Sequence, residues 1–379
     1  MIFQISLVGH ARKRQSHKVV SGFTLIELLV VLFIFLLLTS IALPTVKNLL
    51  ADQKLSKAAR SVTGFFSVAR SRAIAEGRLV GVRIERLGGT NTASFNEAAS
   101  LRLRYLIGIP PYSGDAADSK VFMGGINALG LTTLVFDLND NQMLALALPG
   151  TTNPAFRNGD LIELPGGKLF ALNFDTQPPP PTPPARVTEV HAVINLRAPL
   201  NGSSTYPSGD VIAGNRSMSY RIHRRPIVSS VAPLDFVRGV AIDLNLSGFG
   251  NSGFEFAPNT TDASQPVDIL FGAEGQVAQI SLDSAGNLGP APGLVFLCLG
   301  STDGIRDSVA TTEANAFAVE GKAKPNLLNE ESIWIVINPN TGRVVAAPFG
   351  SVTDTSSRAN ALPFARSLAL LSDTLDAAP

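Results

Sequence analysis

The first hydrophobic feature of the chain is an almost entirely apolar run of 21 residues, Phe23 to Leu43, whose only charged residue is Glu27. A helix of this length extends roughly 32 Å, which matches the hydrocarbon core of a bilayer. The pattern therefore predicts a membrane-spanning helix. Four basic residues and no acidic residue precede it. Because basic residues favour the cytoplasmic side, we expect residues 1–22 to be cytoplasmic and the chain after Leu43 to be exported.

Three kinds of N-terminal segment could explain this pattern. A secretory signal peptide would be cut after its apolar core, and Ser40–Ala42 offers the small residues that such a cut requires. However, the run is longer than the usual core of about 7–15 residues, and it contains a carboxylate. A plain uncleaved anchor leaves Glu27 unexplained, because an acidic residue inside a membrane helix is costly.

Residues Gly22–Glu27, with the sequence GFTLIE, favour the third kind. They resemble the cleavage site of type IV prepilins and type II secretion pseudopilins. The resemblance implies that a prepilin peptidase cuts between Gly22 and Phe23, methylates Phe23 and leaves the helix in the mature protein. Glu27 then occupies the fifth mature position, where the family has its glutamate. A buried carboxylate needs a partner, and the new ammonium group of Phe23 in a neighbouring subunit would supply one and set axial register.

Pro44 follows the apolar run and falls at the twenty-second mature position, where these proteins commonly have a helix-bending proline. A proline can also simply end a membrane span. Combined with the basic leader, Gly22, Phe23 and Glu27, it favours the prepilin interpretation, in which Glu27 and Pro44 serve assembly. The resemblance implies four partners: other pilin-like subunits, a prepilin peptidase, an inner-membrane assembly platform and membrane lipid.

Residues 45–76 are predicted to continue the helix as an amphipathic segment that ends before Gly77. Apolar residues at spacings of three and four form one stripe: Leu55, Ala58, Val62, Phe65, Ala69 and Ala73. Basic residues lie mostly off this stripe: Lys54, Lys57, Arg60 and Arg70. We expect the stripe to pack on the exported domain. The charged face is either solvated, which we prefer, or in contact with other subunits.

Three further segments resemble H-type minor pseudopilins and FimT-like minor pilins. Residues 67–82 look like the end of their helix and their first strand, with Ala-Arg-Ser at residues 69–71. Residues 267–275 are similar to a strand and turn of these proteins, and residues 335–344 to their closing strand with Gly-Arg-Val. Residues 83–266 separate the matching parts, a much longer stretch than the family usually has.

After Gly77 the pattern changes to short strand-like runs separated by turns, which predicts a mainly antiparallel β body. The expected strands are residues 79–84, 102–107, 131–138, 144–148, 190–196, 237–244, 269–271, 294–297 and 333–337. The proline tract 177–184 is an extended spacer that either divides two lobes or forms an exposed loop insertion. Residues 351–379 form either a short helix or a loose tail.

Composition changes this picture little. The 33 glycines and 25 prolines exceed the average usage of about 7% and 5%, which favours short strands and turns. A net charge of +1 argues against a nucleic-acid platform, and no nucleic acid is expected as a partner. The basic cluster Arg221, Arg224 and Arg225 fits a solvated strand edge better than an anion or DNA site. The single cysteine, Cys298, excludes an intramolecular disulfide and is expected to be a buried, inert thiol.

Catalytic and metal-binding motifs are absent from the sequence, which has no H-E-x-x-H, C-x-x-C, Walker A or G-x-S-x-G pattern. Two of the four histidines, His10 and His17, lie in the leader. Residues Asp137–Asn141 space oxygen ligands like the first half of a calcium loop but lack its glycine and distal glutamate, so a β-turn explains them. We predict no enzyme activity, no cofactor and no metal.

The sequence thus predicts an α+β, pilin-like protein in which a long N-terminal transmembrane helix packs on a mainly antiparallel β head. Its expected parts are a leader (1–22), a transmembrane segment (23–43), an amphipathic continuation (44–76), a β-rich exported head (77–350) and a tail (351–379). The expected function is that of a minor pseudopilin subunit of a type II secretion system in the inner membrane, with a periplasmic head. The alternative is a minor pilin of a type IV pilus with an adhesive or DNA-binding head.

Overall fold

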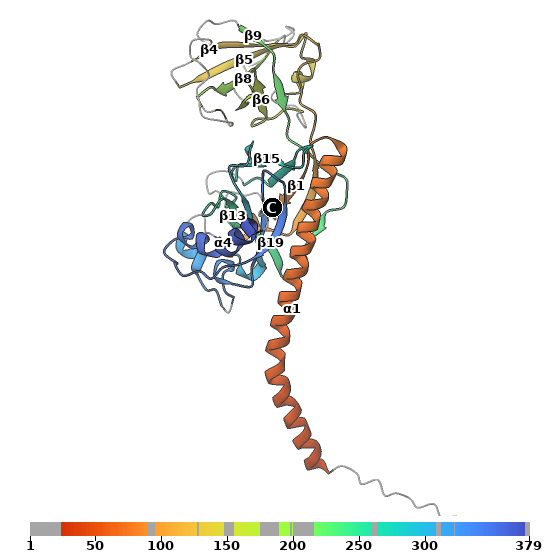
Figure 1. The fold of residues 1–379 in the computed structure, drawn as a ribbon, viewed down its shortest axis with the longest axis vertical. Helices are drawn as coiled ribbons and strands as arrows, with labels where there is room; N and C mark the ends of the chain where they lie inside the picture. Colours follow the sequence, from red (N-terminus) through yellow and green to blue (C-terminus); the bar gives the residue numbers. More distant parts are fainter. Residues whose placement is uncertain are drawn as a thin grey trace, which may run out of the picture. The chain divides into compact units, whose positions relative to one another are not determined.

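The structure is a computed structural model of the chain. It describes residues 24–88, 95–126, 129–147, 155–174, 189–197, 199, 216–258, 264–307, 312–321 and 323–375. The chain divides into two compact units, Met1–Ala51 and Asp52–Pro379. Helix α1 (Leu25–Glu76) begins in the first unit and ends in the second. In the second unit, the described residues between 112 and 223 form a β-rich insert lobe, and the other described residues form a helix lobe that contains the end of α1 (Figure 1).

The helix lobe contains two antiparallel sheets in the described part of the chain. The seven-stranded sheet has the order β11 (Ile227–Val228), β3 (Arg102–Ile107), β1 (Val80–Glu85), β14 (Val267–Phe271), β15 (Val277–Ser281), β16 (Leu288–Gly289), and β12 (Leu234–Asp235) also pairs with β3. The five-stranded sheet has the order β19 (Val344–Pro348), β18 (Ile333–Ile337), β17 (Val295–Ser301), β13 (Val240–Phe249), β2 (Ala99–Ser100). Short helical turns and one longer helix complete the lobe: α2 (Phe95–Ala98), η2 (Thr302–Gly304), η3 (Glu313–Phe317), η4 (Asn326–Leu328) and α4 (Arg358–Leu375).

The five-stranded sheet is buried on both faces. Alternate side chains of β17, including Val295 and Leu297, enter the core that the sheets share with α1, whereas Phe296 and Cys298 enter a second core beneath α4. Because successive side chains of a strand point to opposite faces, a strand covered on both sides reads as a continuous apolar run. This explains the run at residues 294–299, and it confirms that Cys298 is buried.

The insert lobe has its own hydrophobic core. Its described strands form a four-stranded sheet, β8 (Glu189–Asn195), β5 (Leu131–Asp137), β4 (Val121–Ile126), β9 (Arg216–Met218), and a three-stranded sheet, β10 (Arg221–His223), β6 (Leu161–Leu164), β7 (Lys168–Ala171). Buried and half-buried residues alternate along β5, as expected for a strand with one face on a core. The lobe is inserted between β3 and β11, so the chain leaves the seven-stranded sheet and returns to it.

The protein is thus α+β, with an N-terminal helix and a mostly antiparallel β-rich body. Several predicted strands are confirmed, and the bounds of β3 and β18 agree residue for residue. The predicted strand at residues 144–148 is wrong. That region is the 3₁₀ helix η1 (Gln142–Ala147), which starts where the Leu144 N–H donates to the Asn141 carbonyl, 3.0 Å. The local hydrogen bond of this turn therefore outweighs the tendency of a short apolar run to form a strand.

The sequence left alternatives open for two segments, and the structure describes one of them. The proline tract 177–184 itself lies outside the described residues, but β7 before it and β8 after it contribute to the same insert-lobe core. Both interpretations of the tract, a divider of two lobes and an exposed loop insertion, stay predictions. The C-terminal segment contains α4, an 18-residue helix whose buried side is Ala361, Leu362, Ala365 and Ala369.

Candidate assembly helix

Helix α1 begins with a reciprocal set of hydrogen bonds between Thr24 and Glu27. The Glu27 N–H donates to Thr24 Oγ1 (3.3 Å), and Glu27 Oε2 accepts from the Thr24 N–H (2.9 Å) and hydroxyl (3.0 Å). This arrangement is a capping box, which satisfies donors at the first helical turn that lack partners within the helix. Thr24 therefore holds the carboxylate at the start of α1.

The sequence reasoning found Glu27 but missed Thr24. The signal was present, because Thr24 and Glu27 have the T-x-x-E spacing of a capping box directly before an apolar run. Gly22 and Phe23 lie outside the described residues, so cleavage and methylation there stay predictions. Pro44 lies inside α1, about 25 Å along the helix from Glu27 at 1.5 Å per residue. The structure thus brings Glu27 together with Thr24 and keeps it apart from Pro44.

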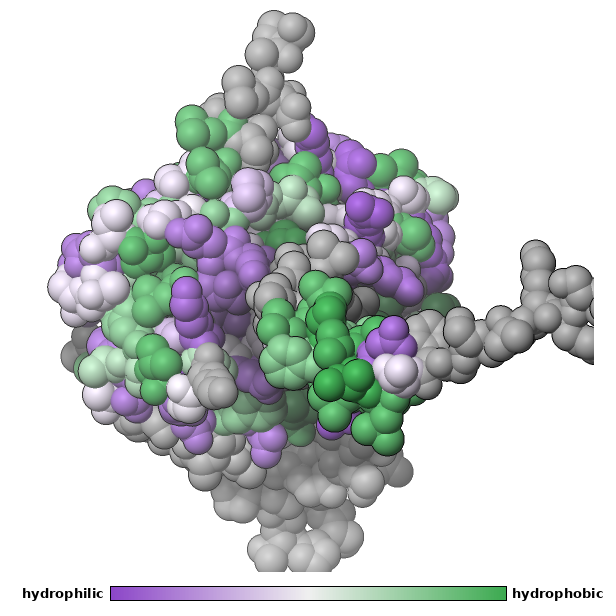
Figure 2. Space-filling model, turned by 90° about the horizontal axis from the view of Figure 1, so that it is seen from below, coloured by the Kyte–Doolittle hydropathy of each residue, from purple (hydrophilic) through white to green (hydrophobic). Residues whose placement is uncertain are grey.

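The N-terminal part of α1 exposes large apolar side chains around its whole circumference. Residues Leu25 to Leu38 include thirteen such side chains, with exposed fractions of 47–83%. The space-filling view shows a dense group of strongly hydrophobic residues on the face turned to the viewer (Figure 2). A helix that is apolar all round is normally buried, either in a membrane or among other helices. No helix in the part of the chain that the structure describes is long and apolar enough to cross a membrane, so the predicted span stays a prediction.

The amphipathic part of α1 packs on the sheets as predicted. Five residues of the predicted stripe are buried: Leu55, Ala58, Val62, Ala69 and Ala73. The sixth, Phe65, is half-buried and stacks on Tyr105 of β3 with ring centroids 3.9 Å apart. Phe66, which the prediction left out, is fully buried and meets Phe271 of β14 edge-on at 6.5 Å. These contacts fix residues 55–73 of α1 to the body of the helix lobe.

Arg70 joins this helix to two turns that are distant in sequence. Its Nε donates to the carbonyl oxygens of Gly275 (3.0 Å) and Thr341 (3.1 Å). Gly342 has φ +64°, and its backbone lies so close to the Gly275 carbonyl that a side chain would overlap it. Arg70, the turn after β14 and the turn between β18 and β19 thus form one contact, which we call the Arg70 clamp. The three segments that resemble minor pseudopilins meet at this clamp.

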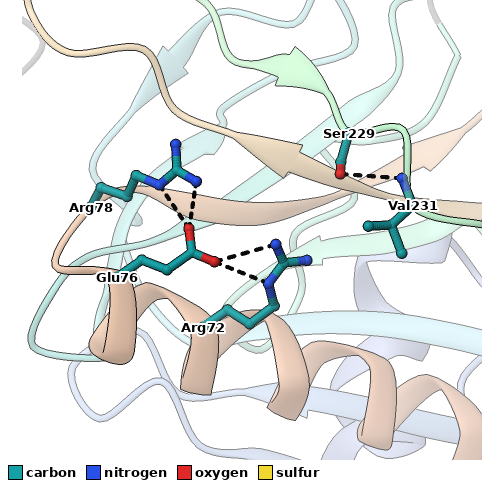
Figure 3. A network of polar contacts seen from close by, with 5 residues as sticks. All are labelled: Arg72, Glu76, Arg78, Ser229 and Val231. Atoms are coloured by element: carbon teal, nitrogen blue, oxygen red, sulfur yellow. Dashed lines mark hydrogen bonds and ion pairs between the residues drawn. The ribbon is translucent and has the colours of Figure 1, made fainter.

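An ion triplet closes the end of α1, shown in Figure 3. Glu76 lies between Arg72 and Arg78, with N–O distances of 3.2 Å and 2.6 Å. The hydrogen bond from Arg78, above all, holds the pKa of Glu76 below its usual value. Helix α1 ends at Glu76, and the next residue, Gly77, has a φ of 62°, the left-handed conformation typical of the position after a helix. The triplet thus links the last turn of α1 to the first residue after Gly77.

The other residues singled out for chemistry have structural surroundings. Asp137 Oδ1 accepts hydrogen bonds from the Asn139 backbone and side chain, both 2.9 Å, which is the pattern of an Asx-turn. Asn141 in the same loop donates to the Asp137 carbonyl and accepts from Tyr220. Within the described ranges, no group of three or more His, Cys, Asp or Glu residues is arranged to hold a metal ion. Burial raises the pKa of the Cys298 thiol, which disfavours the reactive thiolate.

The basic cluster on and after β10 is divided among three surroundings. Arg221 is exposed on β10, the edge strand of its sheet, as predicted for a solvated edge. Arg224 lies over the Phe156 ring at 5.5 Å and donates to the Pro110 carbonyl at 3.3 Å. Arg225 lies in the wall of a cavity between the two lobes. Sequence alone could not distinguish the three, because the difference arises from how the insert lobe returns to the helix lobe.

Comparison with known proteins identifies the N-terminal segment. Residues 18–43 match the family model described as the prokaryotic N-terminal methylation motif. No curated protein and no solved structure matches the chain. The matched motif implies processing by a prepilin peptidase, pilin-like partners and a pilin-type N-terminal anchor in the membrane. It supports a pilin-type subunit of the type IV prepilin and pseudopilin superfamily.

Proposed function

We propose that this protein is a minor pseudopilin-like subunit of a type II secretion system, which assembles through α1 into a short filament that drives protein export. The observation that carries the proposal is the match of residues 18–43 to the N-terminal methylation motif. In this proposal the mature chain begins at Phe23, spans the inner membrane once and has its head in the periplasm. Its partners are other pilin-like subunits, the assembly platform and membrane lipid.

The two parts of α1 suit the two tasks of such a subunit. The first part exposes apolar side chains in every direction, so it can exchange a lipid environment for contacts with neighbouring helices. The second part is fixed to the head by the buried stripe and the Arg70 clamp. Because the helix and the head are joined by core packing, axial movement of the helix carries the head with it. The role is mechanical, and no enzyme activity is part of the proposal.

The Arg70 clamp supports the H-type assignment within the superfamily. Arg70 belongs to the segment that resembles the end of the family's helix, and its acceptors belong to the segments that resemble its strand-turn and closing strand. Residues separated by 205 and 271 positions are thereby brought into one contact. If these three segments have the same arrangement here as in H-type minor pseudopilins, they must lie next to one another, and the clamp brings them together.

A second candidate is a minor pilin of a type IV pilus with a binding head. The observation that favours it is the insert lobe, which has its own core and borders a cavity with the helix lobe. A filament subunit that only transmits force has no evident use for such a lobe. The two candidates share α1 and differ in what the head does.

Deleting the gene in the source cell tests the choice. We expect protein export to the medium to fall to background and surface pili to remain, because a pseudopilin acts only in secretion. Complementation with the wild-type gene is expected to restore export, and the Gly22→Ala variant, which should not be processed, is expected to fail. Intact export together with pili that are lost, or that no longer bind their surface, would instead establish the minor pilin.

A further inference from the structure

A cavity of about 530 Å³ lies between the insert lobe and the seven-stranded sheet of the helix lobe. Its volume falls in the range of about 300–1,000 Å³ that is typical of ligand sites, and such sites are common between domains. Beside it, Leu161 of the insert lobe packs with Leu106, Leu270 and Leu288 of the helix lobe, so the two walls are joined by apolar contact. The cavity is therefore a built feature of the fold.

The floor of the cavity is formed by an arginine and an aspartate that pair with each other. Arg83 of β1 and Asp268 of β14 are cross-strand partners, and two parallel hydrogen bonds of 2.7 Å join the guanidinium to the carboxylate. Their side chains are only 22% and 9% exposed. A bidentate pair of this kind uses the charge of both groups, so it offers a flat and nearly neutral surface to a ligand.

The acidic residue of the cavity wall, Asp160, also has hydrogen-bond partners within the protein. Asp160 is buried, and its two carboxylate oxygens accept backbone N–H groups, one from Arg157 at 2.8 Å and one from Arg225 at 3.2 Å. These bonds hold the backbone of both arginines beside the cavity. Both guanidinium groups lie near enough to the Asp160 carboxylate to favour its charged form, but neither forms an ion pair with it or with another described acidic residue.

The two guanidinium groups have donors to spare. Arg225 Nη2 donates to the Asn158 carbonyl at 3.2 Å, while its Nε is buried and has no hydrogen-bond partner among the residues that the structure describes. The Arg157 side chain forms no hydrogen bond or ion pair within the same residues. Arg157 is exposed at the mouth of the cavity and Arg225 is half-buried, so the buried Arg225 Nε is the donor that most needs an acceptor. Two guanidinium groups on one wall match a carboxylate.

The remaining wall indicates what carries that carboxylate. Apolar side chains flank the two arginines: Ile109, Ala155, Pro226, Ile227, Val228 and Leu288. Ile227 and Val228 form β11, a strand of two residues after Pro226 at one edge of the seven-stranded sheet, and the Ile227 side chain is 54% exposed. An edge strand can pair with an added extended chain, and apolar pockets on either side can hold its alternate side chains. An extended peptide meets both conditions, and a small inorganic anion meets neither.

We propose that the cavity between the two lobes binds an extended peptide segment of another protein, whose carboxylate accepts hydrogen bonds from Arg157 and Arg225. The apolar wall and the edge of β11 hold the residues on either side of that carboxylate. The binding site goes beyond the proposed function and is compatible with either filament system, because it depends on the head alone. In this proposal the insert lobe serves to recognise that peptide segment.

Fluorescence polarisation with short peptides and the full-length protein in nonionic detergent tests this proposal. The probes are N-acetyl-Ile-Glu-Ile-amide, its Gln counterpart, and the Gln peptide with a free C-terminal carboxylate, each labelled with a neutral fluorophore. We expect the Glu peptide or the free acid to bind at least about tenfold more tightly than the neutral amide, because hydrogen bonds to a charged group are stronger than those to a neutral one. Whichever binds more tightly identifies a side-chain or a terminal carboxylate.

Three single variants locate the binding. Arg157→Gln and Arg225→Gln are each expected to remove the preference for the charged peptide, whereas Arg221→Gln, a charge loss on the exposed edge of β10, is expected to leave it unchanged. Thermal unfolding by circular dichroism shows whether each variant is folded. Arg157 makes no side-chain bond, so its variant carries the test even where Arg225→Gln is unstable.

Several results would overturn the proposal. One is equal binding of the charged and neutral peptides, and another is undiminished binding by the folded Arg157→Gln variant. A third is the absence of any binding below about 1 mM, which corresponds to only about 4 kcal/mol of binding free energy. Inorganic phosphate that displaces the peptide at the concentration at which the peptide binds would show a general anion site in place of a peptide site.

Discussion

Replacing Arg366 with methionine is expected to destabilise the head by about 3–5 kcal/mol, because buried acceptors lose a charged donor that nothing else can supply. Arg366 lies on α4 and is fully buried. Its Nη1 donates to the Gly250 carbonyl, and its Nη2 donates to the carbonyls of Leu246 and Gly253, each at 2.8 Å. The guanidinium therefore holds the turn at the end of β13 against α4.

The ring contacts of Arg366 add to this effect. Its guanidinium carbon lies 4.6 Å from the ring centroid of Phe296 and 4.9 Å from that of Trp334, within the range of cation–π attraction. Burial lowers the pKa of Arg366 to about 9, so the side chain is still charged at neutral pH. Methionine fills similar space but donates no hydrogen bond, and the three carbonyl groups are part of the backbone and cannot be removed with it.

Urea unfolding measures the loss. Trp334 is the only tryptophan of the chain, is buried in the same cluster and donates to the Ala365 carbonyl of α4 at 2.8 Å. Its fluorescence therefore reports on the contact between α4 and the five-stranded sheet. The matched control is Arg102→Met, which breaks the exposed ion pair with Asp235 and should leave the unfolding midpoint nearly unchanged. An equally stable Arg366→Met variant would show that α4 is held by its apolar side alone.

Replacing Glu27 with leucine is expected to lower incorporation into filaments by at least about tenfold while leaving the protein in the membrane. Leucine extends the apolar surface of α1, so membrane insertion should not suffer. Assembly should fail, because the proposed pairing of this carboxylate with the N-terminal ammonium group of Phe23 in the next subunit sets the axial register. Cross-linking followed by sedimentation of sheared filaments measures incorporation against the membrane pool.

The capping box supplies the control for this prediction. Thr24→Val removes the hydroxyl that donates to Glu27 and caps the helix, but it keeps the carboxylate. We expect this variant to be incorporated nearly as well as the wild type. If Thr24→Val fails as badly as Glu27→Leu, the carboxylate acts by capping its own helix. If Glu27→Leu is incorporated normally, neither role of Glu27 matters for assembly.

The parts of the fold that follow one local period were predictable from the sequence. Five residues of the predicted α1 stripe are buried, and the strands at residues 102–107 and 333–337 have the predicted bounds. The same reasoning failed at residues 144–148, where hydrogen bonds made by Asn141 turn the chain. Short apolar runs are ambiguous because a few turn-forming bonds outweigh their strand tendency.

The features that depend on distant parts of the chain were not predictable. α4 was left undecided because its buried side consists mainly of alanines and includes Arg366, which reads as a surface residue until its carbonyl acceptors are known. The Arg70 clamp joins residues more than 200 positions apart, and the cavity exists only because the insert lobe returns to the helix lobe. Thr24 was predictable, because the T-x-x-E spacing of Thr24 and Glu27 is local to the sequence.

The central claim is that this chain is processed as a prepilin, and the mass of the mature N-terminus tests it most directly. The full-length protein is expressed together with a prepilin peptidase and analysed by mass spectrometry. The prepilin account predicts a chain that begins at Phe23 with a methylated amino group, and a leader that stays attached in the Gly22→Ala variant. A chain that begins at Leu43, or a leader that stays intact in the wild type, would contradict it.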